Sequence, residues 1–175
     1  MTDEFGRLCQ GLGPNSDMPT GSETMFFIPK HSIPKGRTVT YARVVCADRP
    51  EKTNPKRVRI TCGGDRIEFP GDVSTKTADI VTVKVLLNSV ISTPGARFMT
   101  GDLKDFYLGT PMERFEYMRI SVKIIPRHIY DLYKLKDLTT DGFVFVEIRR
   151  GMYGLPQAGR IANDQLVAFL APHGY

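Results

Sequence analysis

Two carboxylates three residues apart, followed by an aromatic ring, are the first residues of this sequence whose types and spacing suit chemistry. Asp102 and Asp105 precede Tyr107 in a run that begins with apolar residues and ends in a Gly/Pro turn. We expect residues 96–102 to form a short strand, which would place Asp102 at a strand end where a metal ion or a substrate can reach it. The ring of Tyr107 can then face the same pocket.

The oxygen chemistry of this run suits a hard cation. The carboxylate of Asp102 and the backbone carbonyl of Leu103 are the kind of ligand that Mg²⁺ and Mn²⁺ prefer. Nucleotidyl transfer uses two such ions to hold the attacking and the leaving oxygen. Asp102 and the carbonyl of Leu103 are therefore candidate metal ligands. A pair of solvated carboxylates at a strand end is the simpler alternative.

A second run, Tyr153-Gly-Leu-Pro-Gln157-Ala, begins 46 residues after Tyr107 and opens an expected helix. Proline is favoured in the first turn of a helix, and a helix N-terminus presents N–H groups that attract anions. This arrangement makes Gln157 a candidate for contact with a nucleotide. The alternative is an ordinary junction between a loop and a helix.

The two runs, in this order, resemble the first catalytic motif and the substrate-binding loop of the reverse transcriptase of an LTR retrotransposon. The second run is similar to the Tyr-Gly-Leu-Lys-Gln-Ala signature of copia-like rather than gypsy-like elements, with Pro156 in place of lysine. The resemblance covers residues 37–175. It implies an RNA-directed DNA polymerase with an α+β fold, made of the fingers and an incomplete palm of a right hand.

The resemblance also implies that Asp102 is the catalytic residue and gives roles to other residues. Asp105 matches a position near the nucleotide triphosphate, and Tyr107 matches the steric gate, where a ring excludes a 2′ hydroxyl. Arg43 matches an arginine that grips the triphosphate, and its rigid fork of donors suits phosphate. The implied cofactors are two Mg²⁺ (or Mn²⁺) ions, and the implied partners are dNTP and an RNA/DNA template-primer. The simpler alternatives are that Tyr107 is an aromatic residue of the core and that Arg43 lies on a solvated face of its strand.

Basic residues are concentrated before residue 67. The net charge is +5, and the stretch from Lys30 to Arg66 holds ten Lys or Arg against three Asp or Glu. Residues 57–62 alternate basic and apolar side chains, which predicts a half-buried strand with a cationic face. Such a face binds a phosphate backbone without sequence preference. The candidates for template or primer contact are Arg49, Lys56, Arg57 and Arg59. The same residues would serve a non-catalytic nucleic-acid-binding module, which is the alternative function.

The remaining pattern predicts an α+β domain over residues 37–175. Strands are expected at 38–46, 57–62, 115–120 and 143–148, in addition to 96–102. Helices are expected at 127–134 and 156–170, and a further one, with Ser74, Thr75 or Thr77 as its N-cap and Asp79 in its first turn, up to about residue 91. Residues 1–36 are rich in Gly, Pro and small polar residues and show no sustained period. We expect them to form a linker or a poorly ordered lead-in.

Other features bound the function. An odd number of cysteines without C-x-x-C spacing argues against a disulfide framework and favours a reducing intracellular compartment. No apolar run approaches the roughly 18 residues of a membrane span. A hydrolase is disfavoured because no paired Ser/His/Asp or Cys/His context is present.

The family's Tyr-x-Asp-Asp motif is missing from the sequence, so we interpret the chain as an N-terminal fragment that ends before it. The resemblance therefore implies that a palm hairpin, a thumb and a ribonuclease H region belong to the same polyprotein. It also implies a cytoplasmic location in virus-like particles, or a nuclear one. Because part of the metal-binding carboxylate set is missing, we expect residues 1–175 alone not to polymerise.

Overall fold

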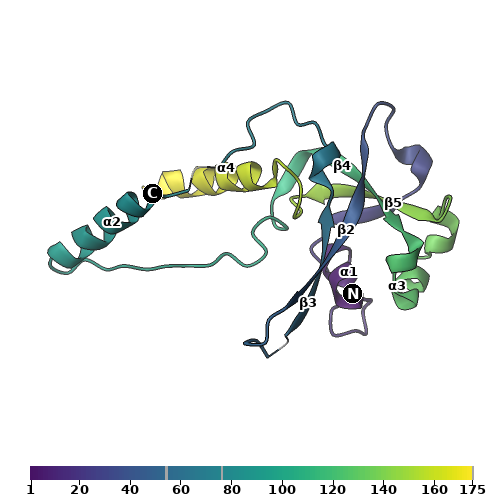
Figure 1. Ribbon diagram of the computed structural model, residues 1–175, viewed down its shortest axis with the longest axis horizontal. Coiled ribbons are helices and arrows are strands. Elements are labelled where there is room, and N and C mark those ends of the chain that lie inside the picture. Colours follow the sequence, from purple (N-terminus) through teal and green to yellow (C-terminus); the bar gives the residue numbers. More distant parts are fainter. Residues whose placement is uncertain (54, 76, 175) are drawn as a thin grey trace.

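A single curled sheet organises the chain in the computed structural model, which describes residues 1–53, 55–75 and 77–174 (Figure 1). The described residues form an α+β fold in which a five-stranded mixed sheet, curled into a half-barrel, is accompanied by four α-helices. The strands are β1 (Met25–Ile28), β2 (Val39–Asp48), β3 (Lys56–Cys62), β4 (Pro111–Ser121) and β5 (Phe143–Arg150), and the helices are α1 (Thr2–Leu8), α2 (Ile80–Ser92), α3 (Arg127–Leu132) and α4 (Ala158–Leu170).

The strand order is β1-β5-β4-β2-β3, and β2 and β4 are the parallel pair. Neighbouring strands β1/β5, β4/β5 and β2/β3 run antiparallel. Alternation along the strands separates two faces, because successive side chains point to opposite sides of a sheet. On β5, Val144, Val146 and Ile148 are buried. Helices α1 and α3 lie together on this inner face (Figure 1) and contribute Phe5 and Ile129 to the core.

The amino-terminal residues belong to the core, so the prediction of a poorly ordered lead-in is wrong. Helix α1 buries Phe5 and Leu8 completely, and strand β1 pairs with β5, placing Met25 opposite Ile148. Cys9 is also fully buried. Loop-like composition did not prevent order here, because a few large apolar side chains spaced between Gly and Pro residues reach the same core.

Most expected elements are confirmed with small changes at their ends. The strands expected at 38–46, 57–62, 115–120 and 143–148 correspond to β2, β3, β4 and β5. The helices expected at 127–134 and 156–170 correspond to α3 and α4, and the helix expected up to about residue 91 corresponds to α2. The N-cap of α2 is Asp79 and not Ser74, Thr75 or Thr77. At least one end of each element moved, by one to five residues. These elements have strong periodicity, which is the most dependable local signal.

The strand expected at residues 96–102 is not formed. The segment from Ala96 to Leu103 has no regular secondary structure, and Asp102 is exposed in it. A strand is stable only when a neighbour pairs its backbone groups, and none of the strands in the described sheet pairs with this segment. Gly101 weakens the segment further, because glycine loses more conformational freedom on folding than other residues.

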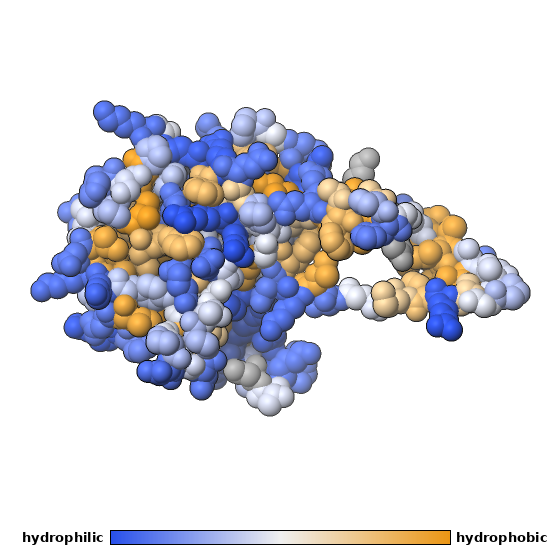
Figure 2. Space-filling model, turned by 180° about the vertical axis from the view of Figure 1, so that it is seen from behind, coloured by the Kyte–Doolittle hydropathy of each residue, from blue (hydrophilic) through white to orange (hydrophobic). Residues whose placement is uncertain are grey.

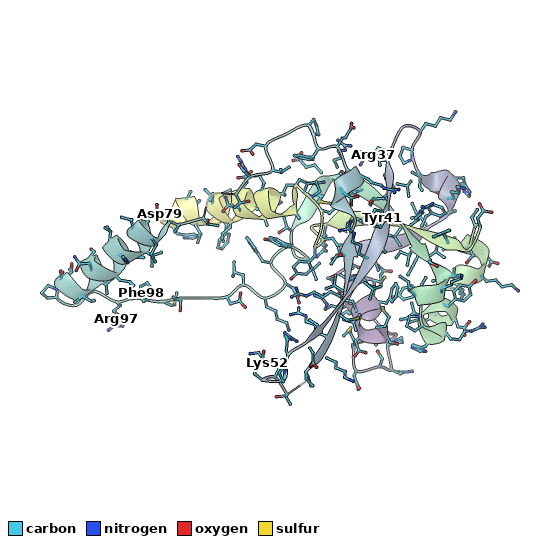
Figure 3. The ribbon with its side chains drawn as sticks, in the orientation of Figure 1. Arg37, Tyr41, Lys52, Asp79, Arg97 and Phe98 are labelled. Carbon is cyan, nitrogen blue, oxygen red and sulfur yellow. The ribbon has the colours of Figure 1, made fainter. Side chains whose placement is uncertain are left out.

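Helix α2 and the segment after it form an arm that projects from the sheet (Figure 1). Figure 3 shows Asp79 at the start of the helix and Phe98 on the returning segment, both away from the sheet. None of the residues of α2 is buried. Figure 2 shows apolar side chains of this arm facing solvent. The arm therefore carries its apolar residues without contributing them to the core.

Candidate nucleic-acid interface

A cavity of about 580 Å³ lies between helix α1, strand β3 and the segment that comes after the arm. Its lining includes six cationic and four anionic side chains. Most of the residues selected from the sequence line it: Arg49, Lys56, Arg57, Arg59, Asp102, Leu103 and Asp105. The basic group and the acidic group are far apart in the sequence, so the fold brings them to one place.

Two arginines of this cavity each have a hydrogen-bond donor without an acceptor among the described residues. The Nε atoms of Arg49 and Arg59 are buried and find no acceptor within the described part of the chain. The guanidinium carbon of Arg59 lies 4.8 Å from the ring centroid of Tyr153, which also lines the cavity. An unpaired buried donor is costly, and a phosphate oxygen can supply the missing acceptor. The cavity therefore has the chemistry of an anion site.

Asp102 and Leu103 line the cavity from a segment without regular structure. Both residues are exposed. The strand that was expected to fix Asp102 is missing, so its position depends on the neighbouring residues 104–108, which lead into β4. Its role as the catalytic and metal-binding residue stays a prediction.

Asp105 is held by a residue of helix α1. Arg7 Nη1 donates to Asp105 Oδ1 at 2.7 Å, and the same guanidinium donates to Glu4 at 2.9–3.0 Å. Glu4 in turn accepts from the backbone N–H of Ile60 at 3.1 Å. Asp105 itself has a φ of 52°, in the left-handed region. This chain of contacts ties α1, β3 and the carboxylate segment together at the cavity.

Glu4, Arg7, Lys104 and Tyr153 line the cavity but were not among the residues selected from the sequence. A signal for Glu4 and Arg7 was present. Acidic residues in a first turn and a basic residue in a last turn favour a helix through its dipole, and α1 has this pattern. The pattern was missed because residues 1–36 were interpreted by composition.

Tyr107 lies just behind the cavity wall and does not line it. Its half-buried ring packs edge-on against Tyr153, with 5.7 Å between the ring centroids. Tyr153 stands between Tyr107 and the basic residues of β3. The steric-gate role of Tyr107 stays a prediction.

Gln157 is buried and does not line the cavity that Asp102 lines. Its Nε2 donates to Glu116 Oε1 at 3.1 Å, while its Oε1 has no partner within the described residues. Glu116 also accepts from Arg37 at 2.9 Å. Gln157 lines a second cavity of about 430 Å³, together with Phe69 and other residues. The structure therefore does not bring Gln157 and Asp102 into one cavity.

Arg43 is likewise outside the cavity. Its exposed guanidinium donates to Tyr41 Oη and lies 3.2 Å from Asp65, and Tyr41 also donates to Asp65 at 2.8 Å. The hydrogen bond from Tyr41 lowers the pKa of Asp65 below its usual value. Arg43 precedes Arg49 by six residues of extended chain, about 20 Å. Arg49 therefore lines the cavity, whereas Arg43 lies outside it.

The described residues do not form a complete two-metal site. No group of three or more His, Cys, Asp or Glu side chains in the described ranges is close enough to hold a metal ion. Asp102 and the carbonyl of Leu103 supply oxygen ligands of the right kind. Two ions need more oxygen donors than these, so residues 1–53, 55–75 and 77–174 do not fit the pair by themselves.

Comparisons with protein-family models, curated proteins and solved structures found no match. Within the described part of the chain, every helix is too short or too polar to cross a lipid bilayer.

Proposed function

We propose that this chain is part of an RNA-directed DNA polymerase of the reverse transcriptase type and that its cavity receives the backbone of a template-primer. One observation supports the proposal: basic residues of the β2–β3 hairpin and residues 102–105 line the same cavity. In this proposal the β2–β3 hairpin belongs to the fingers and the residues around Asp102 belong to an incomplete palm.

The basic residues would hold the nucleic acid by its phosphates. Arg57 and Arg59 are placed on one strand, and the buried unpaired donor of Arg59 would gain a phosphate acceptor. Binding of this kind is blind to sequence and weakens steeply as salt rises. Asp102 and the carbonyl of Leu103 would supply part of the ligand set for Mg²⁺ or Mn²⁺. The remaining donors would come from the nucleotide phosphates and from other regions of the polyprotein, in virus-like particles or in the nucleus.

A non-catalytic nucleic-acid-binding module is the second candidate. It is favoured by the exposure of Asp102 in a segment without strand structure. In this case the basic side chains of β3 would matter, and Asp102 would contribute nothing to ligand affinity.

The cavity can be tested by fluorescence anisotropy with a labelled RNA/DNA template-primer and the full 175-residue chain. We expect the variant Arg57→Gln/Arg59→Gln to bind more weakly and to lower the slope of log K against log salt by roughly 1.8, because each duplex phosphate contact contributes about 0.9. The matched control is Arg127→Gln/Lys136→Gln, which removes the same charge from α3 and the turn after it. An unchanged slope in the cavity variant would exclude the cavity as the nucleic-acid site.

A nucleotide titration separates the polymerase from the binding module. If the chain belongs to a polymerase, Mg²⁺ with the dNTP complementary to the next template base should tighten template-primer binding more than a mismatched dNTP does. Asp102→Asn should remove this difference and leave the binding without nucleotide unchanged. Equal effects of matched and mismatched dNTP would favour the binding module. Primer extension by the chain alone is expected to be undetectable, and measurable extension would show that its carboxylates suffice.

A further inference from the structure

The outer face of the sheet, which points away from α1 and α3, combines aromatic rings with arginines. Strand alternation places Phe26 of β1, Phe143 and Arg149 of β5, and Phe115 and Arg119 of β4 on this face. The solvated face of a sheet is ordinarily polar. We call these five residues the aromatic–arginine face. An exposed sheet face with this composition needs an explanation.

The rings and the guanidinium groups on this face are stacked across neighbouring strands. The guanidinium carbon of Arg149 lies 4.0 Å from the ring centroid of Phe26 and 5.6 Å from that of Phe115. The guanidinium carbon of Arg119 lies 4.9 Å from the ring centroid of Phe143. Both arginines are exposed, and Phe115 retains 36% of its surface. Phe26 and Phe143 are half-buried, so the surface open to solvent consists of the Phe115 ring, the two guanidinium groups and the uncovered parts of the other two rings.

The charge of this face favours an anionic ligand. Arg149 donates to Glu147 at 2.7 Å, which neutralises one of the arginines. Arg119 has no carboxylate within ion-pair distance in the part of the chain that the structure describes. Lys30 adds a further cation beside the face, 5.7 Å from the ring centroid of Phe145, with only a long contact of 3.9 Å to the exposed Asp141. The cationic groups of this face and of Lys30 beside it therefore outnumber the anionic ones, and the excess positive charge lies next to the rings.

We propose that the aromatic–arginine face binds single-stranded nucleic acid. Exposed bases would stack on Phe115, Phe143 and the guanidinium planes, and phosphates would pair with Arg119, as in other proteins that combine stacking rings with cations. A duplex hides the faces of its bases, so this chemistry selects single strands. None of these residues lines the cavity near Asp102. The site is independent of the polymerase proposal.

Anisotropy with a labelled short oligouridine and the full chain tests this site. We expect Phe115→Leu/Phe143→Leu to bind roughly thirtyfold more weakly or worse, because stacking on both rings is lost, with an unchanged salt slope. Lys30→Gln/Arg119→Gln should lower the salt slope by roughly 1.4, at about 0.7 for each single-strand phosphate contact. Arg127→Gln/Lys136→Gln is again the matched control and should leave both quantities unchanged.

Three results would overturn the proposal. The first is unchanged oligouridine affinity of a leucine variant whose circular dichroism and denaturation midpoint match those of the parent chain. The second is binding of a blunt duplex through the same residues with equal affinity. The third is displacement of oligouridine by an oligoglutamate of equal charge, which would identify a general polyanion surface. Arg57→Gln/Arg59→Gln reports on the cavity separately, so a failure there leaves the aromatic–arginine face untouched.

Discussion

Helix α1 buries its large apolar side chains, whereas helix α2 buries none of its own. Helix α1 has seven residues and buries four of them, whereas α2 has thirteen and buries none. The apolar stripe of α2 was the clearer helical signal in the sequence. The comparison shows that periodicity can predict a helix, while burial depends on whether the chain brings a partner surface to it.

The difference arises from the segment that comes after each helix. After α1, the chain returns through β1 to pair with β5, which places Phe5 and Leu8 against the sheet. After α2, the returning segment forms no strand, so nothing in the described ranges draws the helix onto the sheet. Burial and exposure can be compared directly by five experiments, beginning with the largest expected effect.

Thiol reactivity should differ most between the packed and the exposed parts of the chain. Cys46 is exposed, whereas Cys9 and Cys62 are buried. Burial raises the pKa of both buried thiols, that of Cys62 to about 12. At pH 8 roughly one Cys62 thiol in 10,000 is the reactive thiolate. We expect a disulfide reagent to titrate one thiol in the native protein and three in denaturant.

The same shift predicts how stability depends on pH. The folded pKa of these thiols lies above the unfolded value, so their contribution is complete below an unfolded pKa of about 8.5 and is lost as the pH rises above it. The free energy of unfolding, measured by denaturant titration, should therefore decrease as the pH rises above about 8.5. Rapid reaction of two or more thiols in the native protein would show that α1 and its neighbours are not packed.

Truncation in α1 should be far more damaging than truncation in α2. Phe5 is fully buried, so Phe5→Ala should lower the free energy of unfolding by about 3–5 kcal/mol. Ile91 is 84% exposed, and Ile91→Ala should change it by less than about 0.5 kcal/mol. Urea denaturation followed by circular dichroism measures both. A large loss in the α2 variant would mean that this helix is packed in solution.

The link between α1 and the cavity should have an intermediate effect. Arg7→Met removes the donors that Glu4 and Asp105 accept, and Glu4 is buried, so we expect a loss of about 1–3 kcal/mol in the free energy of unfolding. Arg127→Met, which breaks the exposed pair with Asp131, is the control and should have no measurable effect. If Arg7→Met and Arg127→Met changed the free energy of unfolding equally, Arg7 would be in solvent and would not hold Glu4 and Asp105.

Removal of the cap of α2 should have the smallest effect. The Asp79 side chain accepts from the backbone N–H of Thr82 at 2.9 Å, and this hydrogen bond lowers the pKa of Asp79. Asp79→Ala should speed hydrogen exchange of the first-turn amides of α2 and leave the denaturation midpoint unchanged. Because the pKa is lowered, the cap is present above the unfolded pKa and weakens as the pH falls through the folded one. A shifted midpoint would indicate that α2 folds with the sheet.

The sequence determined the elements that carry strong local patterns. Alternation in residues 57–62 and 115–120 predicted β3 and β4. Apolar spacing predicted α2, and Pro156 near a first turn predicted α4. Selection of the basic residues and Asp102 by chemistry picked out side chains that share one cavity. The predictions of these elements succeeded because each used information contained in a short stretch.

Tertiary structure alone decided the rest. Strand β1 has four residues and pairs with β5, over a hundred residues later, so no local pattern could reveal it. The segment around Asp102 has the sequence of a strand, but none of the strands in the described sheet pairs with it. Arg7 lines the cavity because α1 docks beside that segment. A strand needs a neighbour and a buried charge needs a counter-charge, and the chain supplies both only when it is folded.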